Sequence, residues 1–461
     1  MSKPAAALAA FALLAVPAGP AAPPAPGAVA FVDVTVIPMD RERRLEHQTV
    51  VVRDGRIAAI GPVRSTPIPD GTTRVDGRGK FLMPGLADMH AHLMPGLGDD
   101  STPAGQQMTL LLANGVTTVR ALGGPKSGLA LRGRLRAGEI AGPSLWLAGP
   151  SLNGNSVKDP ASARRLVEEQ KAAGFDMLKT HGGFSAEIYD TIAATARRLG
   201  MPLTGHVTPE YGLSRALAAG QQIEHLDGYL AALMTGADSG AAPGDQIIVD
   251  PALLARVRED RIPALVAATR AAGVWSGPTL ALFSRIVGDS TAEQLAAKPE
   301  LRYVTPAMRT GMANQWKQIA AEAGAPAEAR TRFVALRNRL VKALHAGGAK
   351  LLVGSDSPQF FMVAGFAVHD EIEAFVSAGL TPWQALEAAT RNPAEWLGAL
   401  DSMGTVARGK RADLLLLDAD PTADARNARR IGGVMVGGRW MDSAAIGAQL
   451  AALAERNAGT R

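Results

Sequence analysis

The segment GLADMHAHLMPG, Gly85 to Gly96, places His90 and His92 one residue apart directly after a hydrophobic run. The chain has 461 residues and only eight histidines, so the pairing is unusual. Alternation along a strand points the two imidazoles to the same face, where they could share a metal ion. Because a polar barrel interior would also accommodate such a pair, its meaning depends on the remaining strands.

The region that follows alternates short apolar strands with helical patterns rich in Ala, Leu and Arg. This alternation is typical of βαβ units and a parallel sheet. Eight candidate strands predict an α/β fold, a (β/α)8 TIM barrel over residues 81–400. The strands are LMPGLADMH from Leu82, VTTVRAL from Val116, SLWLAG from Ser144, FDMLKT from Phe175, PLTGH from Pro202, QIEHL from Gln222, VWSGPTL from Val274 and KLLVGSD from Lys350.

Two stretches of this region, 228–270 and 281–345, are longer than simple connections between a strand and a helix. Each contains one pattern expected to be a barrel helix. The remainder would either enclose the substrate over the strand ends or add packing at the surface.

Metal-competent side chains recur where the predicted strands end. Barrel chemistry lies at the carboxyl ends of the strands, so these side chains should converge at one mouth. Burying such groups without partners would cost several kcal/mol each, and a bound cation removes that cost. The chain has no cysteine, so only nitrogen and oxygen can ligate, which suits Zn²⁺ and also admits Mn²⁺, Co²⁺ or Fe²⁺. The six residues are His90, His92, Lys179, His206, His225 and Asp356.

Lys179 needs a separate explanation, because an ammonium group would repel a metal ion. Desolvation and nearby positive charge would lower its pKa and leave a neutral, nucleophilic amine. Reaction with CO₂ would convert that amine to an anionic carbamate able to bridge two metals. A bound metal ion would also lower the pKa of a water molecule that it holds, from about 15.7 toward 7.

The two ends of the chain have a different character from the middle. Residues 29–80 and 401–445 alternate apolar and polar residues between turns, so they are predicted to join in one small antiparallel sheet domain. Residues 446–461 would form a C-terminal helix or tail. Residues 1–28 resemble a cleavable signal peptide and linker, with a disordered cytoplasmic tail as the alternative, so a periplasmic or secreted location is expected.

Composition limits the partners. A net charge of +5 without long blocks of like charge gives no indication of nucleic-acid binding. No apolar run reaches the length of a membrane span. The expected partner is a small molecule, and a homo-oligomer remains open.

His90-x-His92, Lys179, His206, His225 and Asp356, in this order, resemble the metal-dependent amidohydrolase superfamily, and the two ends resemble its composite β-sandwich domain. The resemblance implies that the two first histidines and Asp356 hold one metal, that carboxylated Lys179 bridges, and that the other two histidines hold a second. It also implies two divalent ions, Zn²⁺ foremost, with Asp356 as general base and then as proton donor to the leaving amine.

Within the superfamily the chain is most similar to the prolidase-like and ochratoxinase-like subgroup, which cleaves dipeptides or N-acyl amino acids. Glu210 follows His206 by four residues, unlike the H-x-x-E spacing of deaminase-like members, which favours the binuclear hydrolase. A mononuclear deaminase or cyclic amide hydrolase remains the alternative. A barrel scaffold without catalysis is a third reading.

Three further residues are candidates for substrate contact. His181 should share the strand face of Lys179, although a supporting role beside the ligands is the competing interpretation. Tyr229 could donate to the developing oxyanion or pack beneath an insertion. Arg120 could pair with a substrate carboxylate or support the barrel mouth through a salt bridge.

Overall fold

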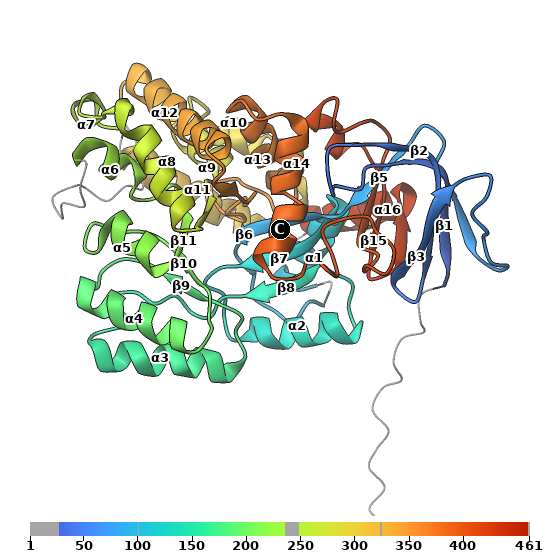
Figure 1. The fold of residues 1–461 in the computed structure, drawn as a ribbon, viewed down its shortest axis with the longest axis horizontal. Coiled ribbons are helices and arrows are strands. Elements are labelled where there is room, and N and C mark those ends of the chain that lie inside the picture. Colours follow the sequence, from blue (N-terminus) through green and yellow to red (C-terminus); the bar gives the residue numbers. More distant parts are fainter. Residues whose placement is uncertain (1–26, 100, 236–248, 323–324, 460–461) are drawn as a thin grey trace, which may run out of the picture.

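The computed structural model describes residues 27–99, 101–235, 249–322 and 325–459 (Figure 1). A sheet built from both chain ends lies at one end of the molecule, and helices surround parallel strands at the other. All but the last two residues of the predicted signal peptide and linker lie outside the described residues, and that assignment stays a prediction. Within the described ranges, no helix has the length and apolar character needed to cross a bilayer.

The two chain ends form one eight-stranded sheet. Hydrogen bonds connect its strands in the order β16-β15-β14-β5-β1-β2-β3, and β4 pairs with β1. Strand β1 runs parallel to β4 and β5, so the sheet is mixed and the prediction of an antiparallel sheet is wrong at these two pairings. Its strands are β1 (Val29–Val36), β2 (Leu45–Arg53), β3 (Arg56–Pro62), β4 (Thr73–Asp76), β5 (Phe81–Pro84), β14 (Leu414–Leu417), β15 (Ile431–Val436) and β16 (Arg439–Asp442).

This sheet has its own apolar core. Phe31, Leu82, Leu416 and Met435 belong to one buried cluster, although they come from opposite ends of the sequence. Burial of such side chains is the main favourable term in folding, so the two ends stabilise each other.

The middle of the chain contains two parallel sheets, β6-β7-β8 and β9 to β13 in consecutive order. Isolated parallel bridges join Ala91 to Ser357 and Ala148 to Met177, at the two junctions between the sheets. All eight strands expected from the sequence are present. They are β6 (Leu86–Ala91), β7 (Val116–Ala121), β8 (Ser144–Leu147), β9 (Leu178–Thr180), β10 (Leu203–Gly205), β11 (Gln222–Glu224), β12 (Trp275–Gly277) and β13 (Lys350–Leu351).

The strand predicted from Leu82 to His90 is two strands, because the chain passes from one sheet to the other at Gly85. Strand β5 pairs with β14, whereas β6 pairs with β7. A Cβ atom on Gly85 would lie 2.3 Å from the Thr117 hydroxyl oxygen, so only glycine fits this junction.

Helices follow most of the parallel strands, and four of them, α1, α3, α4 and α14, begin after a residue whose side chain caps the helix. The Asp159 carboxylate, for example, accepts from the Ser162 backbone N–H at 2.6 Å and begins α3. The helices that connect or follow the strands are α1 (Pro103–Ala113), α2 (Ser127–Ala137), α3 (Pro160–Ala173), α4 (Ala186–Arg198), α5 (Gly212–Ala219), α8 (Ile262–Ala271), α12 (Ala327–Ala346), α13 (Phe366–Ser377), α14 (Pro382–Ala388) and α15 (Arg391–Trp396).

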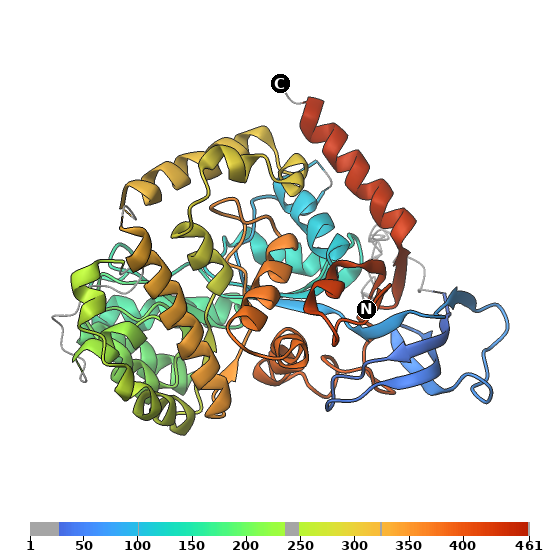
Figure 2. The same ribbon diagram turned by 90° about the horizontal axis from the view of Figure 1, so that it is seen from above.

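The two long stretches contain α8 and α12 of this set and additional helices. The pattern PALLARVREDRIPALVAATRAAG from Pro251 predicts one helix, but it divides into α7 and α8. Pro263 lies in the first turn of α8, where proline is well tolerated. The additional helices are α6 (Tyr229–Thr235), α7 (Pro251–Ala255), α9 (Leu280–Ile286), α10 (Ala292–Ala296) and α11 (Pro306–Glu322). The long C-terminal helix α16 (Ser443–Gly459) runs along one side of the molecule (Figure 2).

His369 of α13 links that helix to the end of α1 and makes stability depend on pH. Its Nε2–H donates to the Asn114 carbonyl at 3.0 Å, its Nδ1 is buried without a partner, and burial lowers its pKa to about 4. An unfolded histidine has a pKa near 6.5, so the unfolded chain binds the extra proton first as the pH falls. The associated loss of stability is absent above about pH 7 and grows between about pH 6.5 and 4.

We therefore expect wild type to lose about 2 kcal/mol more stability than His369→Gln between pH 7 and pH 5. The glutamine can still donate to the carbonyl but does not titrate in this range. Urea unfolding of both proteins at the two pH values measures the difference. Parallel pH dependence would show that His369 is not the titrating group.

Candidate metal centre

Six predicted ligands lie together at the carboxyl ends of the parallel strands. Together with His181 they line one cavity of about 350 Å³. His92 is the most accessible, with 37% of its side chain exposed, whereas Lys179 is fully buried. The six are His90 on β6, His92 just after it, Lys179 on β9, His206 after β10, His225 after β11 and Asp356 after β13.

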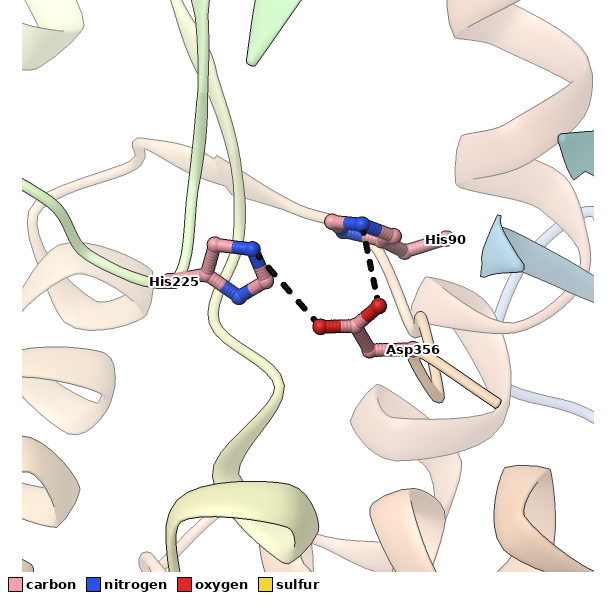
Figure 3. A group of neighbouring side chains, drawn as sticks. All are labelled: His90, His225 and Asp356. Carbon is pink, nitrogen blue, oxygen red and sulfur yellow. Dashed lines mark ion pairs between the residues drawn. The ribbon is translucent and has the colours of Figure 1, made fainter. Parts of the chain in front are cut away.

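Asp356 is the carboxylate at the centre of this group. Its Oδ1 lies 2.7 Å from His92 Nε2 and 3.4 Å from His90 Nε2, and its Oδ2 lies 3.7 Å from His225 Nε2. In Figure 3, His90 and His225 each face one oxygen of this carboxylate. Candidate ligand atoms of these three residues lie within 4.8 Å of one another, close enough to share an ion.

The remaining ligands extend the group beyond Asp356. Lys179 Nζ lies 3.4 Å from His90 Nε2. The His206 ring is 4.8 Å from the His225 ring and 4.5 Å from the His181 ring, measured between centroids. The His90 ring is also 4.7 Å from the His225 ring, so His225 is equally close to His90 and to His206, and Lys179 contacts His90.

Partners around the cluster orient three of the imidazoles through Nδ1. Glu224 contacts His90 Nδ1 at 2.9 Å, Asp227 contacts His206 Nδ1 at 2.7 Å, and the Thr279 hydroxyl contacts His225 Nδ1 at 2.8 Å. An imidazole that donates from Nδ1 presents a lone pair on Nε2, the arrangement that a metal ligand requires. Sequence reasoning did not identify these three partner residues.

The backbone at the ligands is also unusual. His225 and Asp356 have φ values of 62° and 56°, a left-handed conformation that costs a non-glycine residue of order 1 kcal/mol or more. Buried Asp88 supports the backbone at Asp356, because its carboxylate accepts from the Ser355 backbone N–H at 2.9 Å. The same carboxylate accepts from the His90 backbone N–H at 3.2 Å. These bonds connect the first strand to the last and fix their ligands relative to each other.

Burial controls the charge state of the nitrogen ligands. It lowers the pKa of His206 to about 3, and it moves the pKa of His90 and of His225 well below the ordinary value. The pKa of Lys179 is lowered for the same reason. These three imidazoles are therefore neutral at pH 7, as ligation requires.

Asp356 shows the opposite behaviour to an isolated buried acid. Burial opposes its ionisation, but His90, the hydrogen bond from His92, and Lys179 together hold its pKa below the ordinary value. An ionised carboxylate among neutral imidazole nitrogens is the donor set of Zn²⁺ and similar ions. The residues present thus fit the divalent metal that the sequence predicts.

Two of the candidate substrate contacts lie away from the cavity. Arg120 is fully buried, pairs with Glu224 at 2.8 Å and stacks on the Trp396 ring. Tyr229 is fully buried, and its hydroxyl contacts the Thr269 hydroxyl at 2.9 Å. Arg120 therefore forms the supporting salt bridge that was the alternative to substrate contact, and Tyr229 packs in the interior. Neither side chain lines the cavity.

His181 does line the cavity, beside His206. Its Nδ1 is buried without a partner, and burial followed by the charge of His206 lowers its pKa to about 3. Glu210, whose spacing from His206 departs from the deaminase-like pattern, is exposed and does not line the cavity.

Comparison with known proteins agrees with this geometry. Residues 81–441 match the amidohydrolase family. The chain belongs to that family. It is a metal-dependent hydrolase that acts on carbon–nitrogen bonds. The parallel sheets of this amidohydrolase give it an α/β architecture.

Individual relatives cover most of the chain. Imidazolonepropionase from Methylobacterium sp. (strain 4-46) is 27% identical over 405 residues, which are 82% of this chain and 90% of the relative. The solved structure of bottromycin amidohydrolase is 26% identical and has a TM-score of 0.68, covering 92% of this chain and 90% of its own. A Xaa-Pro dipeptidase with bound methionine shares the fold, with 19% identity, a TM-score of 0.65 and coverage of 90% and 100%.

Proposed function

We propose that this amidohydrolase uses two divalent metal ions, with Zn²⁺ foremost, to hydrolyse an amide bond in a dipeptide or N-acyl amino acid. The observation that carries the proposal is the fully buried Lys179 amine among the imidazoles and Asp356. An uncharged lysine at this position can react with CO₂ and supply the anionic bridge that two cations require. The lowered pKa of Lys179 supports that reaction.

The proposed assignment of ligands to the two ions is the one that the family resemblance implies. His90, His92 and Asp356 would hold one ion, His206 and His225 the other, and carboxylated Lys179 would bridge. The bound ions would lower the pKa of the attacking water and polarise the scissile carbonyl. The orientation of His90 by Glu224 and of His206 by Asp227 supports ligation through Nε2.

The protein side chains would manage the protons. Ionised Asp356 accepts a proton from the attacking water as the water oxygen bonds to the carbonyl carbon. It then returns that proton to the leaving nitrogen as the carbon–nitrogen bond breaks. Neutral His181, protonated on Nε2, can donate a hydrogen bond to the carbonyl oxygen from the cavity wall.

Two further expectations belong to this proposal. The eight consecutive parallel strands and the bridges at both sheet junctions support a closed (β/α)8 barrel. The apolar N-terminal segment supports export to the periplasm or outside the cell.

Metal analysis and amide hydrolysis test the proposal together. We expect about two metal ions per chain, and we expect hydrolysis of dipeptides or N-acyl amino acids that chelation abolishes and added Zn²⁺ restores. The group of His90, His225 and Asp356 would suffice for one ion, so a mononuclear deaminase or cyclic amide hydrolase is the alternative. One ion per chain with deamination or ring opening would favour it.

A further inference from the structure

The wall of the metal cavity is divided into a polar half and an apolar half. The imidazoles, Lys179 and Asp356 form the polar half, at the strand ends. The additional helix α9 supplies Leu282, Phe283 and Ile286, whose spacing of one and four residues places them on one helix face. Ile319 of α11 and Phe360 complete the apolar half, and Gln359, next to Phe360, is the one uncharged amide in the described lining.

The apolar half reaches the reacting centre itself. The Phe283 ring centroid lies 5.8 Å from that of His225. A substrate whose scissile bond lies beside the imidazoles therefore places its neighbouring group against α9.

Helix α9 is held firmly in this position. Buried Glu371 of α13 accepts from the backbone N–H groups of Leu280 and Ala281, at 2.9 and 2.7 Å, at the start of the helix. Thr279, directly before the helix, contacts His225 Nδ1, so one residue joins the helix to the metal centre. The Arg337 guanidinium lies 3.8 Å from the Phe283 ring centroid and orients that ring.

Among the described residues that line the cavity, Lys179 is the only lysine or arginine. Arg285, on the same helix, pairs with Asp370 at 2.8 Å and donates to the Phe361 carbonyl, outside the lining. The parts of 27–459 outside the described ranges contain no Arg or Lys in the sequence. A substrate carboxylate would therefore lack the bidentate arginine partner that usually recognises it.

We propose that α9, Ile319 and Phe360 select amides carrying an aromatic or branched aliphatic group next to the scissile bond, and that a free substrate carboxylate adds no affinity. This inference rests on the proposed function for the reaction itself. It narrows the substrate class to apolar acyl or amine groups. The buried apolar contact supplies the discrimination.

Binding of simple hydroxamates to the metal-loaded protein tests the inference separately from catalysis. All probes share the metal-binding group, so differences in Kd report the cavity wall. We expect phenylacetohydroxamic acid to bind about tenfold or more tightly than acetohydroxamic acid. Succinic acid monohydroxamate should bind no more tightly than its carboxamide analogue.

Variants locate the selecting surface. Ile286→Ala and Ile319→Ala should each reduce the phenyl preference about threefold or more. Ile140→Ala is the matched control, because Ile140 is a partly buried isoleucine lining a separate cleft, and it should leave the preference unchanged.

Equal Kd values for the phenyl and methyl probes, or tenfold tighter binding of the carboxylate probe, would overturn the inference even in an active amidase. A retained phenyl preference without hydrolysis of any dipeptide or N-acyl amino acid would instead refute the proposed reaction and support the apolar ligand class.

Discussion

Asp356→Asn is expected to lower kcat for amide hydrolysis about 10²- to 10⁴-fold, the range associated with loss of a general acid–base group. Asparagine keeps the size and one oxygen of the carboxylate but cannot accept the proton of the attacking water. Among the described residues, Asp356 is the carboxylate that pairs with the Nε2 atoms of His92, His90 and His225, at 2.7, 3.4 and 3.7 Å. Steady-state kinetics with saturating metal measures the loss.

Asp413→Asn provides the control for this substitution. Asp413 is also a buried aspartate, but it lies in the composite sheet region and pairs with Arg411. Its replacement should leave kcat unchanged even where it lowers thermal stability. A kcat for Asp356→Asn within about threefold of wild type, at equal metal content, would exclude Asp356 as the proton acceptor.

The ligand positions could be predicted because two simple regularities act together. Parallel strands of a barrel end at the same edge, and side chains two residues apart share a face. Lys179 and His181 illustrate both, since each lines the cavity as expected. The eight strands themselves follow from short apolar runs between helical patterns.

The partners of the ligands could not be predicted, because the strand period fails where they lie. Glu224 and His225 are adjacent and should face opposite sides of a regular strand. Both point to the interior because His225 leaves the strand with a positive φ. One sequence signal did point to Glu224. Gln222 and Glu224 are two residues apart and share one face of a strand, and a buried carboxylate there requires a charged partner, which in the structure is Arg120.

The location of the additional helices also required the structure. The sequence of 281–345 predicts helices but does not say whether they face the cavity or the solvent. The answer depends on long-range contacts of α9 with Glu371 and of α11 with the core, and a helical pattern alone does not encode such contacts.

Lys179→Ala is expected to reduce the metal content from about two ions per chain to one or none, with loss of amide hydrolysis to background. Two divalent cations at close range repel strongly, and an anionic bridge between them offsets that repulsion. Alanine removes the bridge. It leaves the imidazoles and Asp356 in place, so one weakly held ion can remain.

Lys350→Ala is the matched control for this variant, because Lys350 lies on β13 of the same set of strands but is exposed and pairs with Glu395. It should retain both ions and full activity. ¹³C NMR of protein equilibrated with ¹³CO₂ should show a carbamate signal in wild type and Lys350→Ala that is absent from Lys179→Ala. Equal metal content in wild type and Lys179→Ala would refute the bridging role and make the mononuclear reaction the better explanation of this cavity. Loss of one ion together with loss of the carbamate signal would show that binding of the second metal depends on the buried amine of Lys179.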